Sequence, residues 1–224
     1  MFEKPIEAAL FDMDGLLIDT ESVYIEALQV AAEAMDLEMP LAFCHSMIGI
    51  PGPVCEGMIR DFYGAGFDIT VFDGHFDAHA ARRFAAGVPV KPGAVELLDF
   101  LKAADLALAL VTSSSPATVE KHLGHVGLYD RFDAIVTRND VVHAKPAPDI
   151  YLEAARRLGV PPAHCLALED SNTGLTAAHA AGTMAIMVPD VLQPTDEVRA
   201  KCLHVAPDLH AVLRLVRPKL SPVR

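Results

Sequence analysis

The chain has 224 residues, 52% of them hydrophobic, and its 30 acidic and 18 basic residues give a formal net charge of −12 at pH 7. This length allows one large core with an insertion, and no apolar run approaches the roughly 18 residues of a membrane helix. The few, dispersed Lys and Arg residues argue against nucleic acid as a partner, and the four cysteines form no Cys-x-x-Cys pair that would indicate a disulfide framework or a zinc site.

The first residues lack the basic and long apolar regions of a signal peptide, so we expect a cytoplasmic protein without a membrane partner. A short apolar run then begins at Ala8 and ends in Asp12, Asp14 and Gly15. Alternate side chains of a strand point the same way, so the two aspartates project together. Two such carboxylates need a shared proton or a cation, although solvated acids before a turn would give the same local pattern.

Helical periodicity follows this strand. The segment 19–21 offers helix-starting side chains, and apolar residues recur at helical spacing as far as Met35. Pro40 and the Gly/Pro-rich segment 49–53 interrupt the pattern, and further helices are predicted over 54–63 and 71–86. Because no credible strand occurs between residues 17 and 87, we predict an all-helical insertion there.

From Pro92 onward helices and strands alternate. We predict helices over 95–101, from Pro116, and over 150–158, 173–181 and 209–216, with strands over 106–111, 134–136, 165–168 and 184–188. Continuous apolar strands of this kind indicate a parallel sheet covered on both faces. The predicted fold is therefore α/β, a Rossmann-like parallel sheet core (residues 1–16 and 88–224) with an inserted all-helical domain (17–87), and ligands are expected outside the carboxyl ends of the strands.

Three more polar clusters follow predicted strands or their loops. Thr112, Ser113 and Ser114 come just before a helix that opens at Pro116, where hydroxyls and helix amides can bind phosphoryl oxygens or simply cap the helix. Lys145 stands in Lys-Pro-Ala-Pro-Asp, in which the prolines fix the backbone, although such a lysine is commonly a solvated loop charge. Finally, Glu169 and Asp170 close an apolar strand before a helix, either as ligands or as caps.

These clusters, opening with Phe-Asp-Met-Asp-Gly-Leu-Leu-Ile-Asp-Thr-Glu, resemble the four motifs of the haloacid dehalogenase superfamily, in its helical-cap, β-phosphoglucomutase-like branch (subfamily IA). The resemblance implies a phosphomonoester hydrolase in which Asp12 is the nucleophile that forms an aspartyl-phosphate and Asp14 is the general acid and base. It also implies that Thr112 and Lys145 bind the transferring phosphate, and that the substrate contacts include Ser113, Ser114 and Asn172.

The resemblance further implies a Mg²⁺ cofactor. Its ligands would be Asp12, the backbone carbonyl of Asp14, Asp170 and, directly or through water, Glu169, an oxygen-only set that suits Mg²⁺. The partner would be a small phosphorylated metabolite, selected by the helical cap acting as a mobile lid, and we expect the selecting residues near 46–52. We expect a monomer or weak dimer.

Alternative functions and an alternative metal site are also to be considered. A sugar-phosphate mutase such as β-phosphoglucomutase would share every core residue, but its cap histidine is replaced here by Tyr24. Dehalogenases of the family lack the second aspartate of the first motif, so Asp14 argues against a dehalogenase. A non-catalytic binding protein would be expected to have lost one of the motif residues. A metal cluster of Asp73, His75 and His79 is a further alternative, because His75 and His79 share a helix face. No glutamate base accompanies them, so we expect a solvated cap face instead.

Overall fold

The computed structural model describes residues 2, 4–48, 50, 52–64 and 66–220. Contacts divide the chain into two compact units, which we call the core unit (residues 1–19 and 89–224) and the helical unit (20–88). None of the helices in the described residues is long and apolar enough to cross a membrane.

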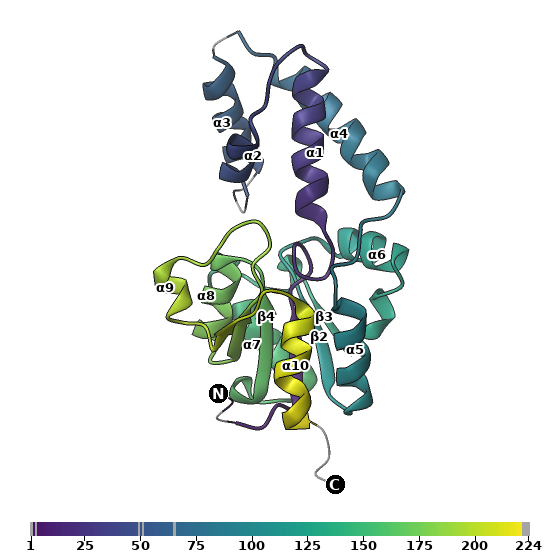
Figure 1. Ribbon diagram of the computed structural model, residues 1–224, viewed down its shortest axis with the longest axis vertical. Helices are drawn as coiled ribbons and strands as arrows, with labels where there is room; N and C mark the ends of the chain where they lie inside the picture. Colours follow the sequence, from purple (N-terminus) through teal and green to yellow (C-terminus); the bar gives the residue numbers. More distant parts are fainter. Residues whose placement is uncertain (1, 3, 49, 51, 65, 221–224) are drawn as a thin grey trace. The chain divides into compact units, whose positions relative to one another are not determined.

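A six-stranded sheet forms the centre of the core unit (Figure 1). Its strands are β1 (Ala8–Phe11), β2 (Ala107–Val111), β3 (Ala134–Val136), β4 (Cys165–Glu169), β5 (Met184–Met187) and β6 (His204–Val205), in the spatial order β3-β2-β1-β4-β5-β6. All neighbouring pairs are parallel. The strand order reverses at β1, which lies between β2 and β4, and such a switch point is where doubly wound sheets bind ligands. The predicted Rossmann-like α/β fold is thus confirmed.

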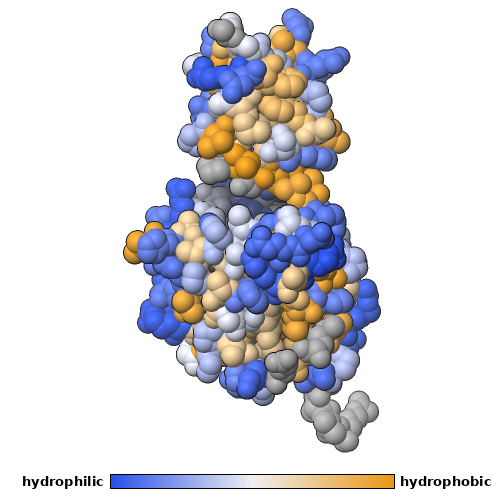
Figure 2. Space-filling view, turned by 90° about the vertical axis from the view of Figure 1, so that its left-hand side faces the viewer, coloured by the Kyte–Doolittle hydropathy of each residue, from blue (hydrophilic) through white to orange (hydrophobic). Residues whose placement is uncertain are grey.

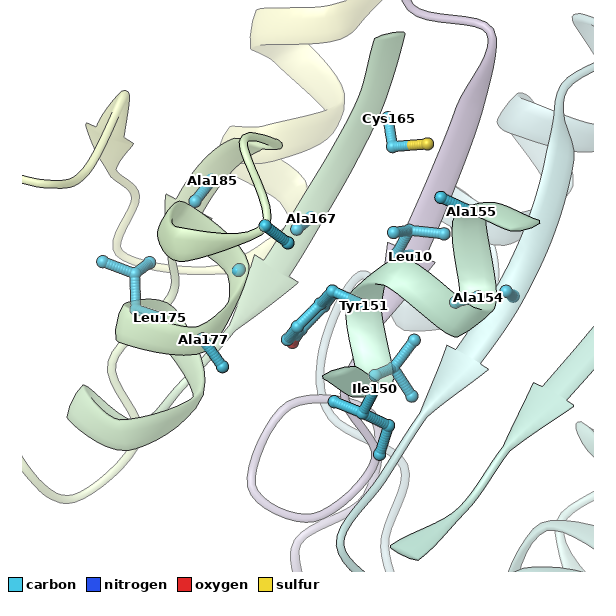
Figure 3. Close-up of a cluster of buried hydrophobic side chains, with 14 of the residues drawn as sticks. Leu10, Ile150, Tyr151, Ala154, Ala155, Cys165, Ala167, Leu175, Ala177 and Ala185 are labelled. Carbon is cyan, nitrogen blue, oxygen red and sulfur yellow. The ribbon is translucent and has the colours of Figure 1, made fainter. Parts of the chain in front are cut away.

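Helices cover both faces of this sheet. In the core unit they are α5 (Ala94–Ala103), α6 (Pro116–His125), α7 (Asp149–Leu158), α8 (Asn172–Ala180), α9 (Asp196–Arg199) and α10 (Leu209–Leu220), with 3₁₀ turns at Tyr129–Arg131, Arg138–Asp140 and Pro162–His164. Figure 3 shows side chains of α7 and α8 gathered with Leu10 and Ala167 of the strands into one buried cluster. The alternate strand residues Ala9 and Phe11 are also fully buried, and α5 and α10 pack against each other over that second face (Figure 1).

Local signals set several helix ends. Ser115 caps α6 by accepting a hydrogen bond from the Thr118 amide at 3.3 Å, and Pro116 occupies its first turn. The α7 helix ends at Gly159, whose φ of 70° suits glycine. The start of α6 matters for the site because the predicted phosphate-binding residue Thr112 lies in the loop just before it.

The insertion leaves and re-enters the core unit at adjacent points. Ile18 forms an isolated bridge with Val90, and the Asp19 amide donates to the Pro89 carbonyl at 2.8 Å. The sequence predicts residues 17–19 in the insertion and residue 88 in the core, whereas the contacts assign 17–19 to the core unit and 88 to the helical unit. The pairing just described is what ties residues 17–19 to the core unit.

In its described residues the helical unit has four helices: α1 (Thr20–Glu33), α2 (Leu41–Ser46), α3 (Gly52–Tyr63) and α4 (Ile69–Ala85). The α1 and α4 helices pack along each other, and Asp68 caps α4 by accepting from the amides of Thr70 and Val71. The unit has its own small apolar core, which includes Ala31, Cys44, Ile59 and Phe72. Its described residues contain no strand, as the sequence predicts.

Candidate active site

The predicted site residues lie at the carboxyl ends of three adjacent strands. Asp12 follows β1, Thr112 follows β2, and Glu169 is the last residue of β4. The register aligns these ends, because Phe11 is opposite both Leu110 of β2 and Leu168 of β4. The Asp12 amide continues the ladder by donating to the Leu168 carbonyl at 3.1 Å. Parallel pairing therefore brings together residues that are far apart in the sequence.

Lys145 connects two of these strand ends. Its ammonium lies 2.6 Å from Asp12 Oδ1, 2.5 Å from Glu169 Oε1 and 3.2 Å from the Val111 carbonyl oxygen. An ammonium has three donors, so these three acceptors satisfy it. Only 6% of the side chain is exposed, which removes the alternative of a solvated loop charge.

Positive charge is scarce in this buried cluster. Burial raises the pKa of Asp12 to about 8, an effect that the Lys145 ammonium opposes and the Glu169 carboxylate reinforces. Burial alone would lower the pKa of Lys145, but Asp12 and Glu169 together raise it, so this side chain remains a cation. One ammonium thus faces two carboxylates, and a further cation would favour the ionised form of Asp12.

The carboxylates fit a metal ion. Asp12, Glu169 and Asp170 each offer an oxygen, these oxygens lie within 4.8 Å of one another, and no other such group occurs among the described residues. Hard oxygen donors suit Mg²⁺. Glu169 Oε1 accepts hydrogen bonds from Lys145 and Tyr151, whereas Oε2 accepts, among the described residues, only a 3.1 Å hydrogen bond from Ser171 Oγ. Oε2 is therefore the oxygen that a metal or its water could use.

Tyr151 is a site residue that sequence reasoning missed. Its hydroxyl donates to Glu169 Oε1 at 2.5 Å from the buried face of α7, and the Lys145 ammonium lies 5.4 Å from the centre of its ring. Burial and the Glu169 carboxylate raise the pKa of Tyr151 well above its usual value, so the hydroxyl remains a donor. The sequence signal is only an aromatic residue on an apolar helix face, which does not reveal the partner of its hydroxyl.

The hydroxyl cluster after β2 divides into three environments. Ser114 Oγ donates to Asp14 Oδ2 at 2.8 Å, so this serine contacts the predicted acid and base. Thr112 is fully buried, and its Oγ1 accepts from the Ser114 amide at 3.0 Å. Ser113 is exposed. Two of the three hydroxyl residues are therefore held in the network, and Ser114 fixes the orientation of Asp14.

Asn172, predicted to contact the substrate, is the first residue of α8. Its Oδ1 accepts a hydrogen bond from the Thr195 amide at 3.0 Å, which ties this side chain to the segment before α9. The preceding Ser171 caps α8 by accepting from the Gly174 amide at 3.0 Å. A Cβ at Gly174 would overlap the Glu169 carboxylate, so α8 can approach β4 this closely only with glycine.

The alternative histidine cluster does not form a metal site. His79 Nε2 lies 3.1 Å from Glu26 Oε1 on α1, and the only metal-like group found among the described residues is the one in the core unit. Of the expected selectivity segment 46–52, Gly49 and Pro51 lie outside the described residues, whereas Ile48, Ile50 and Gly52 line a pocket.

That pocket lies within the helical unit and has a volume of about 620 Å³, the size of a small-molecule site. Its walls are largely apolar, and its charged lining residues are Glu21, Glu56, Asp73 and Asp77. None of the described residues that line the pocket is a Lys or an Arg. Burial, Glu56 and Asp77 raise the pKa of Asp73. Figure 2 shows orange, hydrophobic side chains on the surface of the unit formed by α1 to α4, which exposes Leu41, Ile50, Val54, Phe62 and Val71.

Residues 6–182 match the family of haloacid dehalogenase-like hydrolases, and the chain belongs to that family. Fructose-1-phosphate phosphatase YqaB from Escherichia coli is 33% identical over 84% of this chain and 98% of its own. A Thermotoga maritima structure, provisionally assigned as a β-phosphoglucomutase, has a TM-score of 0.82 and 28% identity over 95% of this chain and 99% of its own.

A mutant CbbY from Rhodobacter sphaeroides, in complex with xylulose-1,5-bisphosphate, has a TM-score of 0.70 and 29% identity over 91% of this chain and 95% of its own. Family and relatives together identify an enzyme of the phosphatase type in the β-phosphoglucomutase-like branch, as the motifs predict.

Proposed function

We propose that the protein is a Mg²⁺-dependent phosphomonoester hydrolase that works through an aspartyl-phosphate on Asp12. The observation that carries this proposal is the buried cluster in which Lys145 contacts both Asp12 and Glu169, next to Asp170. Phosphoryl transfer asks a protein mainly for position and charge stabilisation, and this cluster supplies a fixed carboxylate, a fixed ammonium and a place for a cation.

In the first step, an oxygen of Asp12 forms a bond to phosphorus as the bond from phosphorus to the leaving oxygen breaks. Asp14 gives its proton to that oxygen, so the leaving group departs as a neutral alcohol. Asp14 then takes a proton from water, whose oxygen attacks the same phosphorus and releases phosphate from Asp12. The Ser114 hydroxyl, 2.8 Å from Asp14, keeps this carboxyl in place through both steps.

The metal would be held by Asp12, Asp170 and the Asp14 carbonyl, with Glu169 bound directly or through a water. When bound, it would neutralise charge on the transferring phosphoryl group. Lys145 would balance the remaining charge, and Thr112, which directly follows β2, would position a phosphoryl oxygen.

For the substrate we infer a small phosphorylated metabolite, with the helical unit as the cap that selects it. The pocket of that unit would recognise the leaving group. Because its charged lining residues are all acidic, it favours a neutral or amine-bearing group and disfavours a second phosphate. A sugar-phosphate mutase remains the second candidate, and Tyr24 argues against it because a phenol carries protons poorly at neutral pH compared with imidazole.

Phosphate release from an aryl phosphate by the purified protein tests this proposal. We expect turnover with Mg²⁺, none after EDTA, and recovery when Mg²⁺ is restored. A panel of sugar, nucleotide and glycolytic phosphates would then identify the substrate class. Undiminished turnover by thoroughly demetallated protein would overturn the mechanism.

A further inference from the structure

Asp190 lies near the proposed metal site but belongs to none of the four motifs. It follows β5, whose end is joined to β4 by a 2.7 Å hydrogen bond from the Val188 amide to the Glu169 carbonyl. The Asp190 side chain is 14% exposed, and its Oδ1 accepts a 2.6 Å hydrogen bond from the Lys91 ammonium. Lys91 therefore fixes the orientation of this carboxylate.

The other carboxylate oxygen of Asp190 lies in a different environment. Asp190 Oδ2 is buried, and no described residue provides it with a hydrogen-bond partner. An unsatisfied buried acceptor destabilises the folded protein, and more so when it is charged, so such atoms usually face a bound water or ion. Because Lys91 occupies Oδ1, Oδ2 is the oxygen available for an outside partner.

Gly15 shows where this oxygen lies. A Cβ built on Gly15 would overlap Asp170 Oδ2 and would stand 3.4 Å from Asp190 Oδ2. Both oxygens therefore face the same glycine, whose φ of 79° is of the kind that glycine adopts readily. Asp190 is thus a neighbour of Asp170, one of the proposed metal ligands.

We propose that Asp190 is a positioning residue for the metal, accepting through Oδ2 a hydrogen bond from a water bound to the cation. Asp12, Glu169 and Asp170 can share one ion, whereas Asp190 does not belong to that group, so it is placed outside the direct ligands. Mg²⁺ usually retains several waters, and carboxylates that bind them orient the metal. The inference rests on the proposed Mg²⁺ site, and it assigns this site a fourth carboxylate.

Calorimetric titration with Mg²⁺ in phosphate-free buffer tests this role without any turnover. Asp190→Asn keeps the shape and an acceptor for Lys91 but turns a donor toward the bound water, so we expect Mg²⁺ affinity to fall by about 10- to 100-fold. Asp190→Glu keeps the charge but displaces Oδ2 by a methylene, and its affinity should fall as well. This second variant decides the matter if the first does not fold.

Asp19→Asn is the matched control. Asp19 is the more distant carboxylate beside Lys91, at 3.9 Å, so this change removes one negative charge from the same ion-pair group without touching Asp190. Its Mg²⁺ affinity should stay within about two-fold of wild type. Wild-type affinity in both Asp190 variants would show that Asp190 serves only the ion pair, whereas wild-type protein that binds no Mg²⁺ would overturn the metal site itself.

Discussion

At the scale of single residues, the proposed reaction depends on one buried carboxylate. Asp12→Asn is nearly isosteric, but an amide is a poor nucleophile, so we expect phosphate release to fall to near the background rate while the circular dichroism spectrum stays unchanged. A variant that kept more than about a tenth of the wild-type rate would have lost less than about 1.4 kcal/mol of transition-state stabilisation. Asp12 would then not be the nucleophile.

The companion change Asp14→Asn should be severe for a different reason. It removes the proton donor, so we expect the loss to be larger for alkyl than for aryl phosphates, whose leaving groups need less protonation. The ratio of kcat/KM for the two substrate types measures this effect. An equal loss on both would argue that Asp14 only positions the phosphate.

Tyr151 offers a test of how Glu169 is held. Tyr151→Phe removes the hydroxyl that donates to Glu169 Oε1 at 2.5 Å, and loss of a hydrogen bond to a buried charge should cost about 1.5–3 kcal/mol of unfolding free energy. Mg²⁺ affinity should fall too, because Glu169 would lose one of its constraints. Denaturant unfolding and calorimetry measure the two effects.

Tyr63→Phe is the control for Tyr151. The Tyr63 hydroxyl donates to the Glu38 carbonyl at 2.8 Å in an exposed position of the helical unit, so its removal should cost less than about 1 kcal/mol and leave Mg²⁺ binding unchanged. Equal effects in the two variants would contradict the role assigned to Tyr151.

Asp12, Asp14, Lys145, Glu169 and Asp170 could be predicted as candidates because each stands in a local pattern at a strand end or in a proline-fixed loop. Tyr151 and Asp190 could not be predicted, because their relevance arises from contacts made by other segments. Tyr151 reaches Glu169 from α7, and Asp190 approaches Gly15 from the loop after β5. Neither contact leaves a local mark in the sequence.

At the scale of elements, α8 must approach β4 closely for Glu169 to be placed. Alanine normally stabilises a helix interior by about 1 kcal/mol relative to glycine, but at Gly174 a Cβ would overlap the Glu169 carboxylate. We therefore expect Gly174→Ala to lower the unfolding free energy by about 1–3 kcal/mol and to weaken Mg²⁺ binding, as measured by denaturant unfolding and calorimetry.

Gly57→Ala provides the comparison for Gly174. Gly57 lies inside α3, is exposed, and a Cβ there would meet nothing within 4 Å. This variant should be more stable than wild type by up to about 1 kcal/mol. Stabilisation of both variants by the same amount would show that α8 can shift without cost.

The elements that sequence patterns predicted best are those with long buried runs. The strands β1, β2, β4 and β5 are apolar and buried on both faces, so they show as continuous apolar segments. The two-residue strand β6, the four-residue helix α9 and the six-residue helix α2 were not predicted. Elements this short contain too few residues to show a period, and their place is set by the neighbours they pack on.

At the scale of the whole molecule, the helical unit is inserted at a point where the core unit already closes on itself. The bridge between Ile18 and Val90 and the 2.8 Å hydrogen bond from the Asp19 amide to the Pro89 carbonyl join the two core-unit segments that flank the insertion. A long-range bridge of this kind has no local signal, which is why the sequence placed the junctions a few residues away. The absence of strands, in contrast, was visible in the sequence.

We expect the core unit to fold alone when a short glycine-serine linker joins residue 19 to residue 89. The linker closes a gap that is already bridged, so its loop entropy is small, and the sheet and its covering helices remain. The shortened protein should unfold cooperatively and bind Mg²⁺ in calorimetry. A protein that lacked cooperative unfolding would show that the core unit needs the helical unit for its stability.

Substrate choice is the property that the helical unit should decide. Attack on an aspartyl-phosphate by water or by a sugar hydroxyl differs only in which nucleophile is positioned, so the core motifs alone cannot set the outcome. Tyr24 stacks on Phe76, with ring centres 6.1 Å apart, where a mutase would carry histidine. We therefore expect hydrolysis, with no interconversion of β-glucose 1-phosphate and glucose 6-phosphate even when the bisphosphate primer is present.

The acidic pocket predicts a preference among phosphorylated substrates. A second phosphate placed about 4 Å from one of its carboxylates would meet a repulsion of about 1 kcal/mol in water and several times more in a partly buried site, so kcat/KM should favour a sugar monophosphate over its bisphosphate by at least about ten-fold. The double change Glu56→Gln with Asp77→Asn should reduce this preference, whereas Glu33→Gln, outside the pocket, should not. Glucose 6-phosphate formed faster than phosphate in a coupled assay would overturn the hydrolase in favour of the mutase.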